Sequence, residues 1–188
     1  MIYLIVVDHA TQFGQNKKLS SKLRSYLTEK IGELEISFIG EEASSDDLTS
    51  IHITSSIVRY VAGEIGIEYR PCDPTDSERK ANGILTGWEI KEKMENLKKV
   101  VKEEVSSTGK FPKEKEDEFR QEMSQNEKLR EEFWYKKIED RIKHNMIFVC
   151  AAGHISTYPS SRGEGFDTLL TKKGVSFQIL PEWFVSNR

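Results

Sequence analysis

Residues 2–7 read IYLIVV, a continuous apolar run that is rich in β-branched residues. Such a run is typical of a strand covered on both faces, as strands in parallel sheets are. Similar runs follow as ISFIG (36–40), IEYRPC (67–72), MIFVCAAG (146–153) and VSFQIL (175–180). Segments with helical spacing separate these runs, so we expect an α/β fold. It consists of a mainly parallel sheet of about five strands with helices on both faces and right-handed crossovers.

The segments between the runs carry apolar residues at helical spacing. In the first segment an apolar residue recurs every four positions, which predicts an amphipathic helix closed by Gly32. Its apolar residues are Leu19, Leu23, Leu27 and Ile31. A second helix is expected after a cap at Ser44 or Ser45, with apolar residues Leu48, Ile51, Ile57, Val58, Val61 and Ile65. Helices over 127–145 and 166–174 precede the last two strands.

The stretch from about residue 75 to 128 has a different composition. Lys and Glu dominate it, and its sparse apolar residues keep helical spacing, at Ile90, Met94, Leu97, Val101 and Val105. SSTGKFP at 106–112 breaks the pattern into two arms. We therefore predict one α/β domain over 1–188 with a charged helical hairpin inserted at about 75–128. The hairpin is a solvated arm, a lid or a dimerisation arm.

Charge and composition exclude several classes of partner. The net charge is -3 and the pI about 5.9, with Lys and Arg dispersed among acids, so we expect neither a nucleic-acid nor a membrane partner. The sequence has no run of about 18 apolar residues. The apolar N-terminus lacks a basic leader and a cleavage site, so a cytoplasmic protein is expected. Cys72 and Cys150 lie in apolar runs and fit neither a disulfide framework nor a zinc pattern.

Polar residues follow the predicted strands where ligands bind in open α/β sheets, at the carboxyl ends. The first strand is followed by His9, the second ends in Glu41 and Glu42, the third is followed by Asp73, and the fourth by His154. We predict that His9, both glutamates and His154 are catalytic. Since side chains alternate along a strand, we expect Glu41 to face a site shared with the histidines, and Glu42 is either a further partner in that site or a solvated or N-capping acid. Each of these residues could instead have a purely structural role, as a cap, a turn residue or a solvated side chain.

The helix predicted at 127–144 carries basic residues within its apolar face. Arg130, Trp134, Lys137 and Arg141 fall within an arc of about 60° when residues are placed every 100°. The basic groups either extend to the surface or turn inward, and we favour the inward arrangement for Arg130, pairing with a strand-end carboxylate or an anionic ligand. Arg70, Asp73 and Trp134 are the predicted substrate-binding residues.

The order of these motifs resembles the superfamily that joins the TraB/Tiki, ChaN-like and erythromycin-esterase-like proteins. The stretches that carry the resemblance are VVDHA, FIGEE, REEFWYKKIEDR and AAGH, with Asp8 in place of the glutamate of the first family motif. IEYRPCDPTDSERKANGI and REEFW…IFVCAAGH also resemble a family of small, uncharacterised bacterial and phage-type proteins. The resemblance covers most of the core and leaves 86–125 unexplained. It implies hydrolysis, either metal-dependent proteolysis or a metal-free reaction.

Two hydrolytic chemistries fit these residues. In one, His9, Glu41 and His154 bind a divalent metal ion that activates water. In the other, a histidine oriented by a carboxylate takes a proton from water, and Arg130 or Arg70 stabilises the developing charge. We therefore expect a hydrolase acting on a small molecule or peptide. The alternative is a non-catalytic module that binds a partner, or a second copy of the chain, through the helical hairpin.

Overall fold

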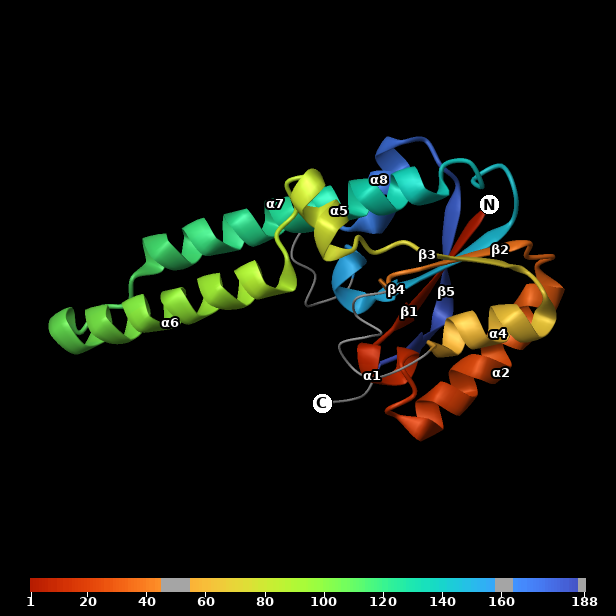
Figure 1. Cartoon of the computed structure of the whole chain (residues 1–188), viewed down its shortest axis with the longest axis horizontal. Helices are drawn as coiled ribbons and strands as arrows, with labels where there is room; N and C mark the ends of the chain where they lie inside the picture. Colours follow the sequence, from red (N-terminus) through yellow and green to blue (C-terminus); the bar gives the residue numbers. More distant parts are fainter. Residues whose placement is uncertain (45–54, 158–163, 186–188) are drawn as a thin grey trace. The chain divides into compact units, whose positions relative to one another are not determined.

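The computed structural model describes residues 1–44, 55–157 and 164–185 (Figure 1). It contains one five-stranded sheet in which every pairing is parallel. The strands are β1 (Ile2–Val7), β2 (Phe38–Glu41), β3 (Glu68–Pro71), β4 (Met146–Ala151) and β5 (Phe177–Phe184). Their order across the sheet is β3-β2-β4-β1-β5. The predicted α/β fold is therefore confirmed.

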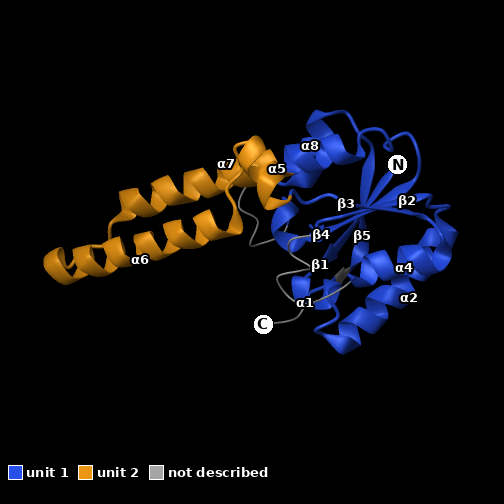
Figure 2. Cartoon of the chain, in the orientation of Figure 1, with its two compact units in different colours: residues 1–74, 131–188 blue, residues 75–130 orange. Residues whose placement is uncertain are grey.

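The chain divides into two compact units (Figure 2). Unit 1 comprises residues 1–74 and 131–188 and holds all five strands, whereas unit 2 comprises residues 75–130. The long helix α7 (Lys113–Ile138) contributes residues to both units. Unit 2 thus corresponds in sequence to the stretch in which we predicted an insertion, at about 75–128.

Helices cover both faces of the sheet in unit 1 (Figure 1). Alternation along β1 and β4 sends apolar side chains to opposite faces. On one face Leu4, Val6, Phe148 and Cys150 pack with Trp134 and Ile138 of α7 and with Phe166 and Leu170 of α8 (Phe166–Lys172). On the other face Ile5, Val7, Ile147 and Val149 pack with α2 (Lys17–Glu33) and α4 (Ile57–Ile65). The continuous apolar runs in the sequence reflect this burial on both faces.

Several element boundaries differ from the predicted ones. A short helix that we did not predict, α1 (His9–Gln12), follows β1, and the Asp8 side chain caps it by accepting the Thr11 N–H at 2.6 Å. Helix α4 begins after a cap at Ser56. The predicted start of a helix near Ser45, together with residues 45–54, lies outside the described residues. Strand β5 extends beyond the predicted 175–180, with an irregular register opposite Leu4 and Val6.

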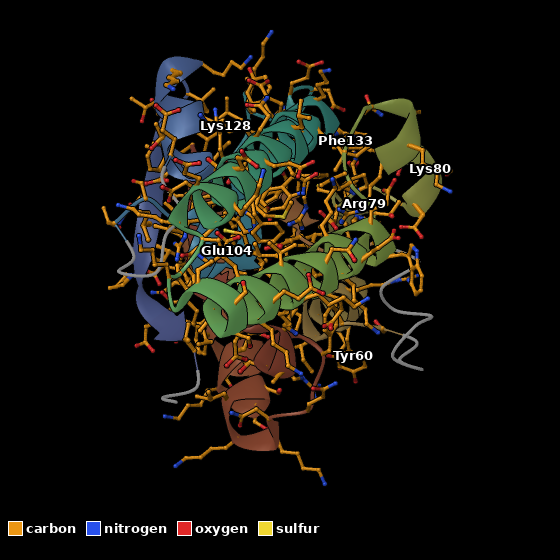
Figure 3. All side chains as sticks on the ribbon, turned by 90° about the vertical axis from the view of Figure 1, so that its left-hand side faces the viewer. Tyr60, Arg79, Lys80, Glu104, Lys128 and Phe133 are labelled. Carbon is orange, nitrogen blue, oxygen red and sulfur yellow. The ribbon has the colours of Figure 1, made fainter. Side chains whose placement is uncertain are left out.

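Unit 2 consists of the short helix α5 (Asp76–Ala81), α6 (Gly87–Thr108) and the first part of α7. Within this unit α6 and α7 run side by side in opposite directions as a hairpin, joined through Gly109, which ends α6 in a left-handed conformation (Figure 2). Figure 3 shows its side chains, with Glu104 on α6 and Lys128 on α7. None of the α6 side chains is buried. Within the described ranges, no helix has both the length and the apolar character that a membrane crossing requires.

Candidate functional site

The strand order places the end of β2 beside the end of β4. These strands are hydrogen-bonded neighbours, and the Glu42 N–H donates to the Val149 carbonyl at 2.8 Å. Glu42 directly follows β2, and His154 ends the 3-10 turn η1 (Ala152–His154) that follows β4. Because parallel neighbours end at the same edge of a sheet, these two side chains can meet.

The His154 imidazole lies between two carboxylates. Its Nε2 is 3.2 Å from Glu42 Oε1, and its Nδ1 is 2.9 Å from Glu131 Oε1 on α7. Exposed fractions are 7% for His154, 4% for Glu42 and 3% for Glu131. Since both ring nitrogens face carboxylate oxygens, the group needs either an imidazolium that donates twice or a proton on one carboxyl. We call these three residues the Glu42–His154–Glu131 cluster.

Two neighbours fix the geometry of the cluster. The Ala151 N–H donates to Glu42 Oε2 at 2.7 Å, so both oxygens of this carboxylate have partners. The Trp134 ring meets His154 edge to face, with ring centroids 4.6 Å apart, and its Nε1–H donates to Asp73 Oδ1 at 3.0 Å. Trp134 is completely buried and Asp73 is 5% exposed, so the predicted substrate-binding pair packs behind the imidazole.

Glu41 belongs to a different network on the other side of the sheet. Its carboxyl group accepts hydrogen bonds from Gln12 Nε2 at 2.9 Å, Ser56 Oγ at 2.7 Å and Tyr69 Oη at 2.5 Å. Burial raises the pKa of the Glu41 carboxyl, against the effect of these donors. Burial, and then the nearby Glu41 charge, also raises the pKa of Tyr69. Our expectation that Glu41 faces His154 is therefore wrong, because the alternation of side chains gives that place to Glu42.

His9 is connected to the glutamate pair through Gln12. It is exposed, its Nδ1 lies 3.1 Å from Gln12 Oε1, and its ring stacks on Phe13. Gln12 is completely buried and its Nε2 donates both to Glu41 Oε1 and to the Glu42 carbonyl, at 2.9 Å each. The expected direct contact of His9 with the glutamate side chains is replaced by this bridge.

The predicted metal ligands His9, Glu41 and His154 thus lie in separate sets of contacts. Across residues 1–44, 55–157 and 164–185, no group of three or more His, Cys, Asp or Glu side chains is arranged to hold a metal ion. The structure does not bring the predicted ligand set together. The reason is again local: β2 sends Glu41 away from His154, and α1 leaves His9 at the surface.

The two predicted arginines have partners of their own. Arg70 on β3 donates to Asp140 Oδ1 at 2.8 Å and to the Lys137 carbonyl, and pairs with Glu68 at 3.0 Å. Its guanidinium is thus held in an ion network beside the end of α7 rather than at the cluster. Arg130 Nη1 pairs with Glu127 Oε2 at 2.8 Å inside unit 2, and its role at the site stays a prediction.

Four residues of these two networks were not predicted from the sequence: Glu131, Gln12, Ser56 and Tyr69. Glu131 is three residues before Trp134, so both side chains leave the same side of α7, a spacing that the sequence does contain. Glu131 nevertheless lies outside the arc of about 60° that holds Arg130, Trp134, Lys137 and Arg141, so the pattern on this helix does not single it out. Gln12 and Ser56 carried no signal, since their contacts depend on how distant segments pack.

The two cysteines, Cys72 and Cys150, are buried as free thiols. Burial raises the pKa of Cys72 to about 12 and that of Cys150 well above its ordinary range. A thiol reacts as the thiolate, so both groups stay protonated and inert near neutral pH.

Comparisons of the chain with families of related proteins, with curated proteins and with solved structures each returned no match.

Proposed function

We propose that this protein is a hydrolase whose reacting groups belong to the Glu42–His154–Glu131 cluster, acting on a small molecule or peptide. One observation carries the proposal: the imidazole of His154, which follows β4, is held between the Glu42 carboxylate, which follows the neighbouring strand β2, and the Glu131 carboxylate of α7, and all three are almost completely buried. Buried groups that share protons in this way are typical of acid–base sites, and strand ends are where open α/β sheets place them.

The three side chains have separate roles in this proposal. Glu131 accepts from Nδ1 and holds the ring orientation, while Nε2 and Glu42 share a proton. Glu42 with His154 accepts a proton from the attacking water as the water oxygen bonds to the electrophilic carbon of the substrate. The bond from that carbon to the leaving group then breaks, and the leaving group takes the proton from the cluster.

Water activation by the cluster is favoured over the metal-dependent alternative. That alternative needs His9, Glu41 and His154 around one ion, and these residues lie in separate contacts. The cluster needs only groups that are already in contact.

The proposal is tested by screening the purified chain against chromogenic esters and fluorogenic peptides. Glu42→Gln, Glu131→Gln and His154→Asn should each lower kcat/KM at least about 100-fold, the usual scale of acid–base catalysis. The matched control is Glu132→Gln, since Glu132 neighbours Glu131 but is 41% exposed at its side chain and pairs with Lys173. These variants disturb buried pairs and can lower stability. The assays are therefore carried out under conditions in which circular dichroism shows that each variant is folded. Full activity in His154→Asn would refute the proposal.

A second candidate function, docking through the hairpin, is favoured by one observation. Helix α6 has 22 residues and buries none of them, and Met94 and Val105 on its apolar stripe are each 43% exposed. A helix of this kind gains most of its stability by covering its apolar face, so this face fits a further helical layer. We take that layer to be the hairpin of a second copy.

A further inference from the structure

The Asp167 side chain of α8 forms hydrogen bonds to the chain just after His154. Asp167, in the first turn of that helix, is 5% exposed. Its Oδ1 accepts the Ser156 N–H at 2.9 Å, and its Oδ2 accepts the Ser156 hydroxyl at 2.5 Å. A bidentate, charge-assisted contact of this kind holds the backbone two residues beyond the imidazole in one place.

The carbonyl of His154 itself lies against Gly165, the residue before α8. A Cβ atom at position 165 would lie 2.4 Å from the His154 carbonyl oxygen and 2.7 Å from its carbonyl carbon. These are backbone atoms, so no side-chain rotation relieves the overlap. The φ of Gly165 is −101°, which any residue adopts, so glycine is needed here for space and not for conformation.

A third contact joins the start of α8 to the same region. Phe166 is completely buried, and its ring centroid lies 5.6 Å from that of Trp134, the residue that packs edge to face on His154. The first turn of α8 therefore contacts the surroundings of His154 at two places: the backbone after His154, and the Trp134 ring that packs on the imidazole.

We propose that Gly165 and Asp167 are positioning residues for His154, which hold its backbone so that the imidazole stays between Glu42 and Glu131. The consequence for catalysis rests on the proposed function. Loss of the Asp167 carboxylate leaves the Ser156 N–H and hydroxyl without their acceptor and frees the segment that carries the ring. The ring then loses one or both of its carboxylate contacts, although neither positioning residue touches it.

The test observes the imidazole directly, by NMR of protein labelled with 15N in histidine. A ring N–H bonded to a buried carboxylate gives a downfield proton that exchanges slowly with water. This signal is assigned to His154 by its loss in His154→Asn. Asp167→Ala and Gly165→Ala should remove it or speed its exchange at least about tenfold, equivalent to about 1.4 kcal/mol of protection.

Two variants separate positioning from general damage to α8. Asp167→Asn keeps an oxygen that accepts the Ser156 N–H and should restore slow exchange. Thr171→Val removes a different hydrogen bond of α8, from Thr171 Oγ1 to the Asp167 carbonyl at 3.0 Å, and should leave the signal unchanged. Should Asp167→Ala not fold, Ser156→Ala removes only the hydroxyl bond and should speed exchange by a smaller factor.

The outcomes distinguish this inference from the proposed function. An unchanged His154 signal in Asp167→Ala, or in Ser156→Ala if that variant replaces it, overturns the positioning role even if His154→Asn abolishes hydrolysis. Loss of the signal in Asp167→Ala with rescue by Asp167→Asn supports the positioning role. This result supports the positioning role even if His154→Asn retains full hydrolytic activity. Retained activity in that variant refutes only the proposed function.

Discussion

Adjacent glutamates at the end of β2 face opposite sides of the sheet, and their carboxyl groups have different surroundings. Glu42 contacts the imidazole of His154, whereas Glu41 is surrounded by the neutral donors Gln12, Ser56 and Tyr69. A step of one residue along a strand thus separates a carboxylate paired with a histidine from a buried carboxyl group with a raised pKa.

The raised pKa of Glu41 predicts a pH dependence of stability. The folded protein binds this proton more tightly than the unfolded chain, whose value is near 4.5. The free energy of unfolding should therefore fall as the pH rises from that value through the raised pKa. We expect thermal melting between about pH 5 and pH 8 to show a smaller decrease in Tm for Glu41→Gln than for the wild type. Glu64→Gln, at the surface, is the control, and parallel curves for all three proteins would contradict the prediction.

The hydroxyl of Tyr69 should contribute measurably to stability. It donates to Glu41 at 2.5 Å inside the fold, so Tyr69→Phe leaves a buried acceptor with one donor fewer. We expect a loss of about 1–3 kcal/mol in the free energy of unfolding, measured with urea. Tyr60→Phe is matched, since Tyr60 also donates to a glutamate, Glu64, at 2.9 Å, but on the surface. Its effect should stay within about 0.5 kcal/mol, and equal losses in the two variants would argue against a special role for burial.

At the scale of elements, Gly40 allows β2 to pack closely against the side chains of Phe148 and Cys72. A Cβ there would lie 2.7 Å from Phe148 Cδ2 and 3.3 Å from Cys72 Sγ. Phe148 cannot turn aside, because it is completely buried against Trp134 and Phe166. Gly40 thus lets β2 lie directly against Phe148, its partner residue on the neighbouring strand β4.

Gly40→Ala should therefore destabilise the protein by about 1–3 kcal/mol, as overpacking of a core does. Gly63→Ala on α4 is the control, because a Cβ at that helical position meets nothing within 4 Å. The control should gain about 0.5–1 kcal/mol from the lower entropy of the unfolded chain. Adding Phe148→Leu should recover part of the Gly40→Ala loss in a double-mutant cycle of urea unfolding. Strict additivity would show that the two sites do not meet.

At the scale of the whole molecule, the two compact units differ in how they use their apolar residues. Unit 1 buries long apolar runs on both faces of its sheet, whereas α6 of unit 2 buries none of its side chains. Charged groups instead line the hairpin, including the pair Lys93–Glu122 at 2.9 Å, which links α6 to α7. Surface pairs of this kind contribute little stability, so the apolar stripe of α6 is the feature that another layer would stabilise.

We therefore expect the protein to self-associate through this stripe. Sedimentation at increasing protein concentration should show a dimer that Met94→Glu weakens at least about tenfold, because a buried carboxylate opposes contact between apolar faces. Lys99→Ala, on a position away from the stripe, should leave the dimer intact. If the protein is a monomer at every concentration, the proposed docking function of the hairpin is wrong.

Periodicity along the chain was sufficient to predict the fold class. The runs at 2–7 and 146–153 indicated strands buried on both faces, and the spacing from Leu19 to Ile31 indicated a helix, because these features depend on neighbours in sequence. The same local reasoning placed His154 and Glu42 at strand ends, where the structure has them.

Long-range packing settled the rest. The strand order β3-β2-β4-β1-β5 selects Glu42 and His154 as neighbours, and no local pattern encodes which strands pair. The contact of Glu131 with His154 joins residues 23 positions apart, and that of Gln12 with Glu41 joins residues 29 apart. A sequence shows which residues lie at strand ends, but it does not show which group each buried polar side chain will bond. An unpaired polar group is costly once it is buried, and its partner is determined only when distant segments have packed together.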